Sequence, residues 1–342
     1  MTVHIDVCNG DADGLCALVQ WRLHEPRAAQ LITGLKREIE LLQRVQASRG
    51  DQLLVCDLSL RRNRAPLERL LDVGVKVRYF DHHDADELKT ELAHPLLDAH
   101  IDSAADTCTS LLVDRYLGGP FTAWALVGAY GDNLTDVADA RAAHLGLDLH
   151  ERQCLQTLGE AINYNAYGDS AQDVLIAPAQ LFPILMRYRH PLAFWEHESI
   201  AKELEALRQS DLRQAGTLIA RWQDAHTRVY MLPDAPWSRR VIGTLANQLA
   251  NEQPARAHAV LKAEGTGGLL VSVRAPLAAP GGAAAFCRHF GGGGRAGAAG
   301  IDHLPEQELP RFMQALSLAQ WGTTGAPGRP EEKGLASLDF SQ

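Results

Sequence analysis

The sequence predicts an α/β protein built from a parallel-sheet N-terminal domain, a helical linker and a smaller α/β C-terminal domain. Three observations lead to this fold class. The chain has 342 residues, more than one compact core usually holds. Residues 3 to 135 alternate short β-rich runs with helical stretches, as parallel sheets covered by helices on both faces do. From residue 228 onward, β-rich runs return after a long helical region, which indicates a second sheet.

Strand and helix patterns follow one another in the N-terminal part. VHIDVC (3–8) is apolar and β-rich, which predicts a buried strand, and GLCALVQWRL (14–23) predicts a helix. The order expected after these two is strand 29–34, helix 36–45, strand 52–58, helix 65–74 and strand 75–80. Ligands of such sheets bind beyond the carboxyl ends of the strands, so the functional residues are expected there.

The remainder of the chain divides into a helical stretch, a second sheet and a tail. Residues 136–222 look helical throughout, and 201–225 predicts one long helix. The second sheet is expected to contain strands 228–233, 257–263 and 269–276 with a helix at 239–252. The expected domains are 1–190, a helical linker 191–226, a second domain 227–321 and a disordered tail 322–342, which is rich in Gly, Pro and charge.

Composition and charge narrow the class of protein. Apolar residues make up 46% and charged residues 22%, an ordinary globular composition. The net charge of −9 disfavours a protein that coats long nucleic acid, although a local cation cluster can still bind a small phosphorylated ligand. No apolar run is long enough to span a bilayer and no signal peptide is evident, so a cytoplasmic protein is expected. The six cysteines lack a C-x-x-C pair, which favours reduced core thiols over disulfides or a zinc cluster.

Acidic residues stand in four places where strand-like, apolar runs end. These places hold Asp11 and Asp13, then Asp57, then Asp81 with His82 and His83, then Asp132. Taken singly, each has a local explanation as a helix cap, an Asx turn or a surface loop. Taken together, they favour one shared cause, because carboxylates and imidazoles suit a divalent ion, manganese above all. Two such ions, about 3.5–4 Å apart, would promote in-line attack on phosphorus.

These residues resemble the signature of the DHH phosphoesterase family. The family is named for the triplet that stands here at 81–83, and the other matching stations are DADG (11–14), CDLS (56–59) and GDN (131–133). The resemblance extends to a DHH-associated C-terminal domain through SVRAP (272–276) and GGGGRAGAAG (291–300).

The resemblance implies a role for each station. Asp57 would bridge two metal ions, and Asp11 would bind the first of them. His83 would face the substrate, and Asp81 would steady an imidazole, so that Asp57, Asp81 and His83 form the catalytic set. The ligands implied for the second ion are Asp13, His82 and Asp132.

The chain departs from the family pattern at the first metal. Many relatives carry a histidine four residues before the first aspartate, where Val7 stands here. Asn9 occupies a position that is aspartate in exonuclease-like members, and it is expected to offer a carbonyl oxygen and to contact the substrate. The first ion would then have fewer protein ligands.

The C-terminal motifs imply a substrate-binding surface. Arg295 stands where members often carry a histidine, and its guanidinium can grip a phosphate with two donors. Glycines leave backbone N–H groups accessible to a ligand, although a flexible linker would also explain them. The substrate-binding residues expected here are Ser272, Arg274, Gly292, Gly293, Gly294 and Arg295. An ion pair on the surface is the alternative for Arg274.

The segment INYNAYGDS (162–170) is a further candidate for substrate binding. Tyr164 and Tyr167 flank Asn165, and such aromatic and amide groups can stack on and hydrogen-bond a base. An amphipathic helix end closed by Gly168 explains them equally well.

The sequence and the resemblance together predict a phosphodiesterase that uses two Mn²⁺ ions, with Mg²⁺ or Co²⁺ as alternatives. The expected substrates are short: linear dinucleotides such as pGpG, nano-RNA or pAp, and not long duplexes. A cyclic-dinucleotide phosphodiesterase, a pyrophosphatase or polyphosphatase, and a non-catalytic nucleotide sensor remain alternatives. No membrane partner is expected, and the protein would be a monomer or a homodimer.

Overall fold

The computed structural model describes residues 2–83, 93–264 and 267–322. The predicted tail therefore lies, except for its first residue, outside the described residues. The chain forms two compact units. Unit 1 comprises Met1–Thr217 and Ala235–Thr244, and unit 2 comprises Leu218–Asp234 and Leu245–Gln342.

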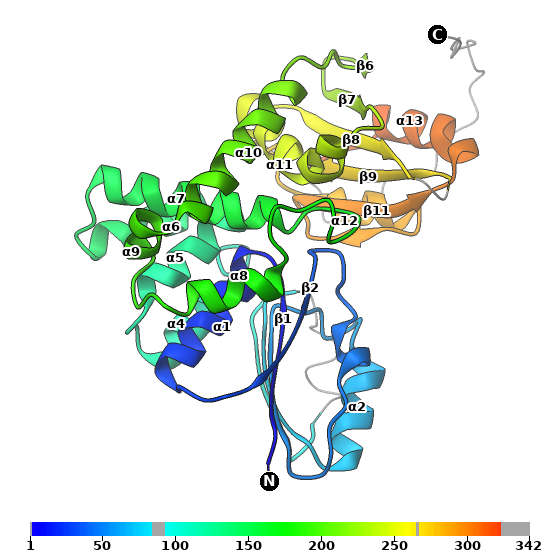
Figure 1. Cartoon of the computed structure of the whole chain (residues 1–342). Helices are drawn as coiled ribbons and strands as arrows, with labels where there is room; N and C mark the ends of the chain where they lie inside the picture. The colour runs from blue at the N-terminus through cyan, green and yellow to red at the C-terminus, as the bar shows by residue number, and fades with distance from the viewer. Residues whose placement is uncertain (1, 84–92, 265–266, 323–342) are drawn as a thin grey trace. The chain divides into compact units, whose positions relative to one another are not determined.

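A five-stranded parallel sheet forms the centre of unit 1, as predicted (Figure 1). Its strand order is β2-β1-β3-β4-β5, so β1 lies between β2 and β3. The strands are β1 (His4–Asn9), β2 (Gln30–Gly34), β3 (Gln52–Cys56), β4 (Lys76–Asp81) and β5 (Leu97–Ile101). All five run in one direction, so their carboxyl ends meet at one edge of the sheet.

Helices cover both faces of this sheet (Figure 1). The larger core contains Leu15 and Trp124 and lies under α1, α4, α5 and α7, whereas Leu67 and Tyr79 belong to the core under α2. These elements are α1 (Ala12–His24), the 3₁₀ turn η1 (Leu41–Arg44), α2 (Arg64–Val73), α4 (Thr109–Leu117), α5 (Thr122–Gly131) and α7 (Leu149–Asn165). The other helices of unit 1, in the part of the chain that the structure describes, are α6 (Thr135–His144), α8 (Pro178–Leu185), α9 (Pro191–His197) and α10 (Ser199–Ala215).

Glycines allow α5 and α7 to approach closely. A Cβ atom on Gly159 of α7 would lie 2.2 Å from the carbonyl oxygen of Val127, and one on Gly131 of α5 would lie 2.9 Å from the carbonyl oxygen of Gly159. Both distances are shorter than any tolerated contact, so these backbones pack too closely for a side chain.

Replacing Gly159 by alanine should therefore destabilise unit 1. Because the backbone of α5 would have to move, Gly159→Ala should lower the free energy of unfolding by about 1–3 kcal/mol, measured by urea denaturation. Gly216 is the matched control, since its φ is −64° and an added Cβ would meet nothing closer than 3.4 Å. Gly216→Ala should be neutral or stabilise by less than about 1 kcal/mol. Equal effects of the two substitutions would contradict this account of the packing.

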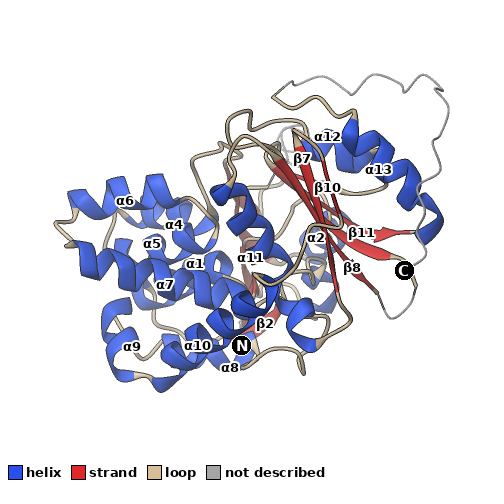
Figure 2. Ribbon diagram, turned by 90° about the horizontal axis from the view of Figure 1, so that it is seen from above, coloured by secondary structure: helices blue, strands red, loops and turns tan. Residues whose placement is uncertain are grey.

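Unit 2 contains the second sheet, with strand order β10-β11-β9-β8-β7-β6. Among the strand pairs of its described residues, β7–β8 is parallel and the other four are antiparallel. Val271 and Val273 of β9 pack in a core with Phe286 of α12 and Phe312 of α13, and Figure 2 shows these helices beside the strands. The strands are β6 (Trp222–Gln223), β7 (Thr227–Leu232), β8 (Ala257–Ala263), β9 (Leu269–Arg274), β10 (Gly293–Gly294) and β11 (Ala298–Leu304). The other elements are α11 (Pro236–Glu252), which continues from unit 1 into unit 2, α12 (Ala283–Arg288), the 3₁₀ turn η2 (Glu306–Glu308) and α13 (Leu309–Ser317).

Three predictions of secondary structure were wrong in part. The helix expected at 36–45 is only the short turn η1, because Asn63 holds this segment through bonds to the Ile39 carbonyl and the Leu42 N–H. The helix expected to reach residue 225 ends at Ala215, and Ile219 beyond it is 90% exposed, so no apolar face continues. Strand β5 was not predicted.

The cysteines and the helix lengths bear on two further predictions from the sequence. All six cysteines are buried and free, which confirms the prediction of core thiols. In the ranges 2–83, 93–264 and 267–322, every helix is too short or too polar to cross a bilayer.

Candidate functional site

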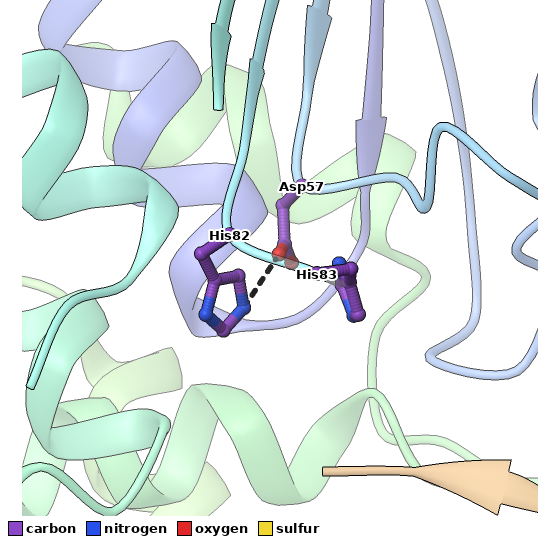
Figure 3. A group of neighbouring side chains, drawn as sticks. All are labelled: Asp57, His82 and His83. Atoms are coloured by element: carbon purple, nitrogen blue, oxygen red, sulfur yellow. Dashed lines mark ion pairs between the residues drawn. The ribbon is translucent and has the colours of Figure 1, made fainter. Parts of the chain in front are cut away.

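The ends of three neighbouring strands bring the acidic stations together in unit 1. Asp11 and Asp13 follow β1, Asp57 follows β3, and Asp81 is the last residue of β4. Figure 3 shows Asp57 beside the two histidines that follow β4. Asp132 differs from the expectation, because it caps the carboxyl end of helix α5 and not the end of a strand. The run before it is buried on every side, a pattern that a buried helix and a buried strand share.

His82 lies at the centre of three carboxylates. Its Nε2 atom is 3.3 Å from Oδ1 of Asp57, 3.8 Å from Oδ2 of Asp13 and 3.9 Å from Oδ2 of Asp132. All four side chains are buried or nearly so. Donor atoms that share an octahedral ion with bonds of about 2.1 Å lie about 3–4.2 Å apart. The three distances from His82 fall in this range, and Asp57, His82 and His83 place donor atoms within 4.8 Å of one another, so this group could hold a divalent ion, with Asp13 and Asp132 beside it.

Asp57 has an unusual backbone and an unfavourable charge. Its φ is +60°, a left-handed conformation that Asp and Asn adopt more readily than most residues. Thr109 donates from Oγ1 to Oδ1 of Asp57 over 3.2 Å. Burial and the nearby charges of Asp11 and Asp13 raise the pKa of Asp57 well above its usual range. The pocket thus has an excess of negative charge that a cation would relieve.

Asp13 is held by the start of helix α4. Its Oδ2 accepts from the Thr109 N–H and its Oδ1 from the Ser110 N–H, both over 2.7 Å. These two N–H groups are among those that a helix leaves without backbone partners at its amino end. The contact fixes the carboxylate of Asp13 without a second charged side chain.

Asp81 orients His83. The distance between Oδ1 of Asp81 and Nδ1 of His83 is 2.7 Å. Asp81 is fully buried, whereas the His83 side chain is 38% exposed. Burial lowers the pKa of His83, but the charge of Asp81 outweighs it and the net pKa is raised. His83 also lies close to the centre of the site, since its donor atoms and those of Asp57 and His82 fall within 4.8 Å of one another.

Asp11 is paired with a residue that the sequence analysis missed. Lys36 places its Nζ atom 2.5 Å from Oδ2 of Asp11 and 2.8 Å from Oδ1 of Asn163. The other carboxylate oxygen of Asp11 accepts from the Gly14 N–H at the start of α1. Burial opposes both charges, but their attraction lowers the pKa of Asp11 and raises that of Lys36. Lys36 follows the carboxyl end of β2, so the rule that located the acidic stations could have located it as well.

Asn9 organises the loop in which Asp11 stands. It is 4% exposed, its Oδ1 accepts from the Asp11 N–H, and its Nδ2 donates to the Lys36 carbonyl. These contacts join the loop after β1 to the segment after β2, so Asn9 has a structural role here, and its contact with substrate stays a prediction.

In unit 2, Arg274 is the centre of a polar cluster. Its Nε donates to Oδ1 of Asn247 over 2.7 Å and its Nη1 to Oγ of Ser272 over 2.9 Å. Asn247, on α11, was not anticipated from the sequence. The cluster holds the guanidinium in one orientation on β9, as a binding group would require.

The glycine-rich loop is shaped by its pairing with β11. A Cβ atom on Gly292 would lie 2.1 Å from the Gly300 oxygen, and one on Gly294 would lie 2.6 Å from Cα of Ala299. Close backbone packing therefore explains these two glycines. A Cβ on Gly293 would meet nothing within 4 Å, so its surroundings are open. Arg295 follows this loop and is exposed.

Tyr164 does not fit the expected role in base stacking. Its side chain is fully buried, and its hydroxyl donates to Asp211, which also binds Arg240. The aromatic ring is part of a buried polar network, so the prediction for Tyr164 was wrong. Tyr167 lies under the ammonium of Lys36, 5.5 Å from its ring centre.

Several solved structures share this fold, and one of them is described as a DHH domain. A DHH-domain protein described as a member of a family of ribosomal proteins has a TM-score of 0.66 at 15% identity, over 92% of this chain and 86% of that one. The exonuclease RecJ bound to manganese has a TM-score of 0.57 at 19% identity, over 92% and 89%. A pGpG-specific phosphodiesterase from Vibrio cholerae has a TM-score of 0.53 at 13% identity, over 92% and 97%.

These likenesses show a shared fold. No protein-family model matches the sequence, and no curated protein matches it.

Proposed function

We propose that this protein is a metal-dependent phosphodiesterase that hydrolyses short linear nucleotides, such as pGpG, nano-RNA or pAp. One observation carries the proposal: carboxylates from three separate segments converge on the Nε2 atom of His82. Two of the similar folds support it, since one is a manganese-bound exonuclease and the other a pGpG-specific phosphodiesterase. Mn²⁺ is the ion we favour, ahead of Mg²⁺ and Co²⁺. A cytoplasmic location and a monomer or homodimer remain predictions.

Each group in unit 1 would have a distinct task. The ion, when bound, would neutralise phosphate charge and make water a better nucleophile. Asp57, Asp13, Asp132 and His82 would hold it. The protonated His83 would donate a hydrogen bond to a phosphate oxygen or to the leaving group, because its Nδ1 is already engaged by the buried Asp81. We also propose that residues 1–190 carry this chemistry, that 191–226 link the domains and that 227–321 bind substrate.

A substrate panel tests the proposal. Purified protein with Mn²⁺ should cleave linear pGpG and short RNA faster than cyclic dinucleotides, pyrophosphate or polyphosphate. Faster cleavage of the cyclic form would favour a cyclic-dinucleotide phosphodiesterase, and comparable phosphate release from pyrophosphate would favour a pyrophosphatase. Nucleotide binding without turnover under Mn²⁺, Mg²⁺ and Co²⁺ would identify a non-catalytic sensor.

Arg274 should contribute to substrate affinity more than to the chemical step. Replacing it by methionine removes a charged donor to phosphate, so Arg274→Met should raise KM by about 10-fold or more and change kcat less. Arg274→Lys keeps the charge but loses the bidentate geometry, so its KM should lie between those of the wild type and Arg274→Met. Steady-state kinetics on pGpG would measure both parameters. A fall in kcat with unchanged KM would contradict the assignment.

The glycine loop is proposed as the second substrate contact in unit 2. Gly293 is the position at which a ligand could approach the backbone, because its surroundings are open, and Arg295 follows as a phosphate donor. Ser272 would act through Arg274, whose guanidinium it binds.

A further inference from the structure

The pocket of unit 1 has two separate poles of charge. At one pole, three carboxylates surround His82, and at the other, Asp11 binds Lys36. The first pole has an excess of negative charge. The second already contains a cation, supplied by the chain itself.

The position of Lys36 is fixed by five contacts. Its backbone N–H donates to the Ala166 carbonyl over 3.0 Å, and its carbonyl accepts from the amide of Asn9. Its ammonium binds Asp11 and Asn163 and lies over the ring of Tyr167. An ammonium with two oxygen partners and an aromatic face beneath it occupies a built cation site.

Asp11 is correspondingly engaged. One of its oxygens binds Lys36, and the other accepts from the start of α1. At the neighbouring positions, Val7 is an apolar core residue and Asn9 is occupied in the loop. Asp11, the ligand expected for a second divalent ion, is therefore already neutralised by the ammonium of the chain itself.

We propose that the ammonium of Lys36 takes the place of one metal ion, so that this chain binds a single divalent ion at the His82 pole. The inference rests on the proposed function only for the identity of the ion-binding residues at that pole. It replaces the pair of ions expected from the sequence with one ion and one fixed lysine.

The number of bound ions tests the proposal directly. Equilibrium dialysis against Mn²⁺ with elemental analysis should give about one ion per chain in the wild type. The electron paramagnetic resonance spectrum should be that of an isolated Mn²⁺ ion and not of an exchange-coupled pair. About two ions per chain with a coupled spectrum would overturn the proposal.

Substitutions at the two poles should differ in their effects. Asp11→Asn should change the Mn²⁺ dissociation constant by less than about threefold, whereas Asp132→Asn should raise it by about 10- to 100-fold or more. Both are carboxylate-to-amide changes, so they form a matched pair. If both variants lost the same affinity for Mn²⁺, Asp11 would be a metal ligand and not only the partner of Lys36.

Removing the ammonium should open the second ion position. Lys36→Met should raise binding from about one ion toward two at millimolar Mn²⁺, and added Mn²⁺ should stabilise this variant more than the wild type. Lys36→Arg keeps the cation and should stay at about one ion. If Lys36→Met fails to fold because Asp11 is left unpaired, the double variant Asp11→Asn/Lys36→Met removes both charges and should fold and bind about one ion. A folded Lys36→Met protein that stays at one ion would refute the idea that the ammonium blocks the second.

Activity assays on the same preparations separate this inference from the proposed function. If the protein bound one ion but hydrolysed no substrate in the panel, the proposed phosphodiesterase activity would be refuted. The proposal that the Lys36 ammonium replaces one metal ion would still hold. A protein with two coupled ions that cleaves pGpG would do the opposite.

Discussion

Asp57→Asn is expected to lower kcat/KM for pGpG by on the order of 10³-fold, which corresponds to about 4 kcal/mol of transition-state stabilisation. Asn keeps the shape of the side chain and tolerates the left-handed backbone at this position, whereas Ala would add strain to the loss of the carboxylate. The activity should fall because the carboxylate between His82 and Thr109 no longer offers a charged ligand. Initial rates with saturating Mn²⁺ would measure the loss.

A control for this substitution exists on β5. Asp98 is exposed and pairs with Arg78, so Asp98→Asn should leave turnover unchanged. If Asp57→Asn retained wild-type turnover, the proposed active site would be in the wrong place.

The same substitution should stabilise the metal-free protein. The folded-state pKa of Asp57 is raised above its unfolded value, so its carboxylate reduces stability once the pH rises above the unfolded pKa of about 4. Metal-free Asp57→Asn should therefore melt at a higher temperature than the wild type at pH 7, and the difference should shrink as the pH falls toward 4. Addition of Mn²⁺ should raise the melting temperature of the wild type only.

Arg22→Met should destabilise the fold by about 3–5 kcal/mol, the largest stability effect we expect from one side chain. Arg22 binds Asp6 with two donors, at 2.6 and 2.5 Å, and both side chains are buried. Methionine fills much of the same volume but leaves the carboxylate of Asp6 unpaired between α1 and β1. Burial already raises the pKa of Asp6, so the loss should be largest at neutral pH and smaller where Asp6 is protonated. Urea denaturation at pH 7 and at lower pH would show both effects.

Two further variants make the result specific to the buried pair. Arg64→Met breaks an exposed pair with Glu68 and should cost less than about 0.5 kcal/mol. Asp6→Leu combined with Arg22→Met removes both charges and should recover most of the lost stability. A double variant as unstable as Arg22→Met alone would mean that packing, and not the unpaired charge, accounts for the loss.

Much of the fold of unit 1 was predictable because its strands are short apolar runs between helical patterns. The prediction failed where the local sequence pattern differs from what contacts with distant residues impose. The run Ile39, Leu41, Leu42 has apolar residues at helical spacing, but contacts with Asn63 hold it as a turn. Strand β5 is at the edge of the sheet and contains Asp98 and His100, so it lacks the apolar character of the inner strands.

The candidate site could be predicted from acidic and histidine residues that stand at the ends of apolar strand-like runs. Asp13, Asp57, His82 and Asp132 were identified in this way, and the structure brings them together. Lys36 could have been found by the same rule, since it follows the carboxyl end of β2, but Asn163 could not, because its contact with Lys36 joins segments 127 residues apart. The backbone contacts of Asn9 were not predicted, because an amide in a loop is equally suited to bind a ligand or a nearby backbone group.

The hydrogen bonds between Asp13 and the first turn of α4 link a proposed metal ligand to a helix. The rest of α4 is packed through Leu111 and Val113 into the larger core of unit 1. A small shift of that helix would move the Thr109 and Ser110 amides, and with them the carboxylate that they hold. Substitutions in the hydrophobic core that shift α4 would thus move the carboxylate of Asp13. We expect such substitutions, although far from the site, to change the affinity for a bound cation.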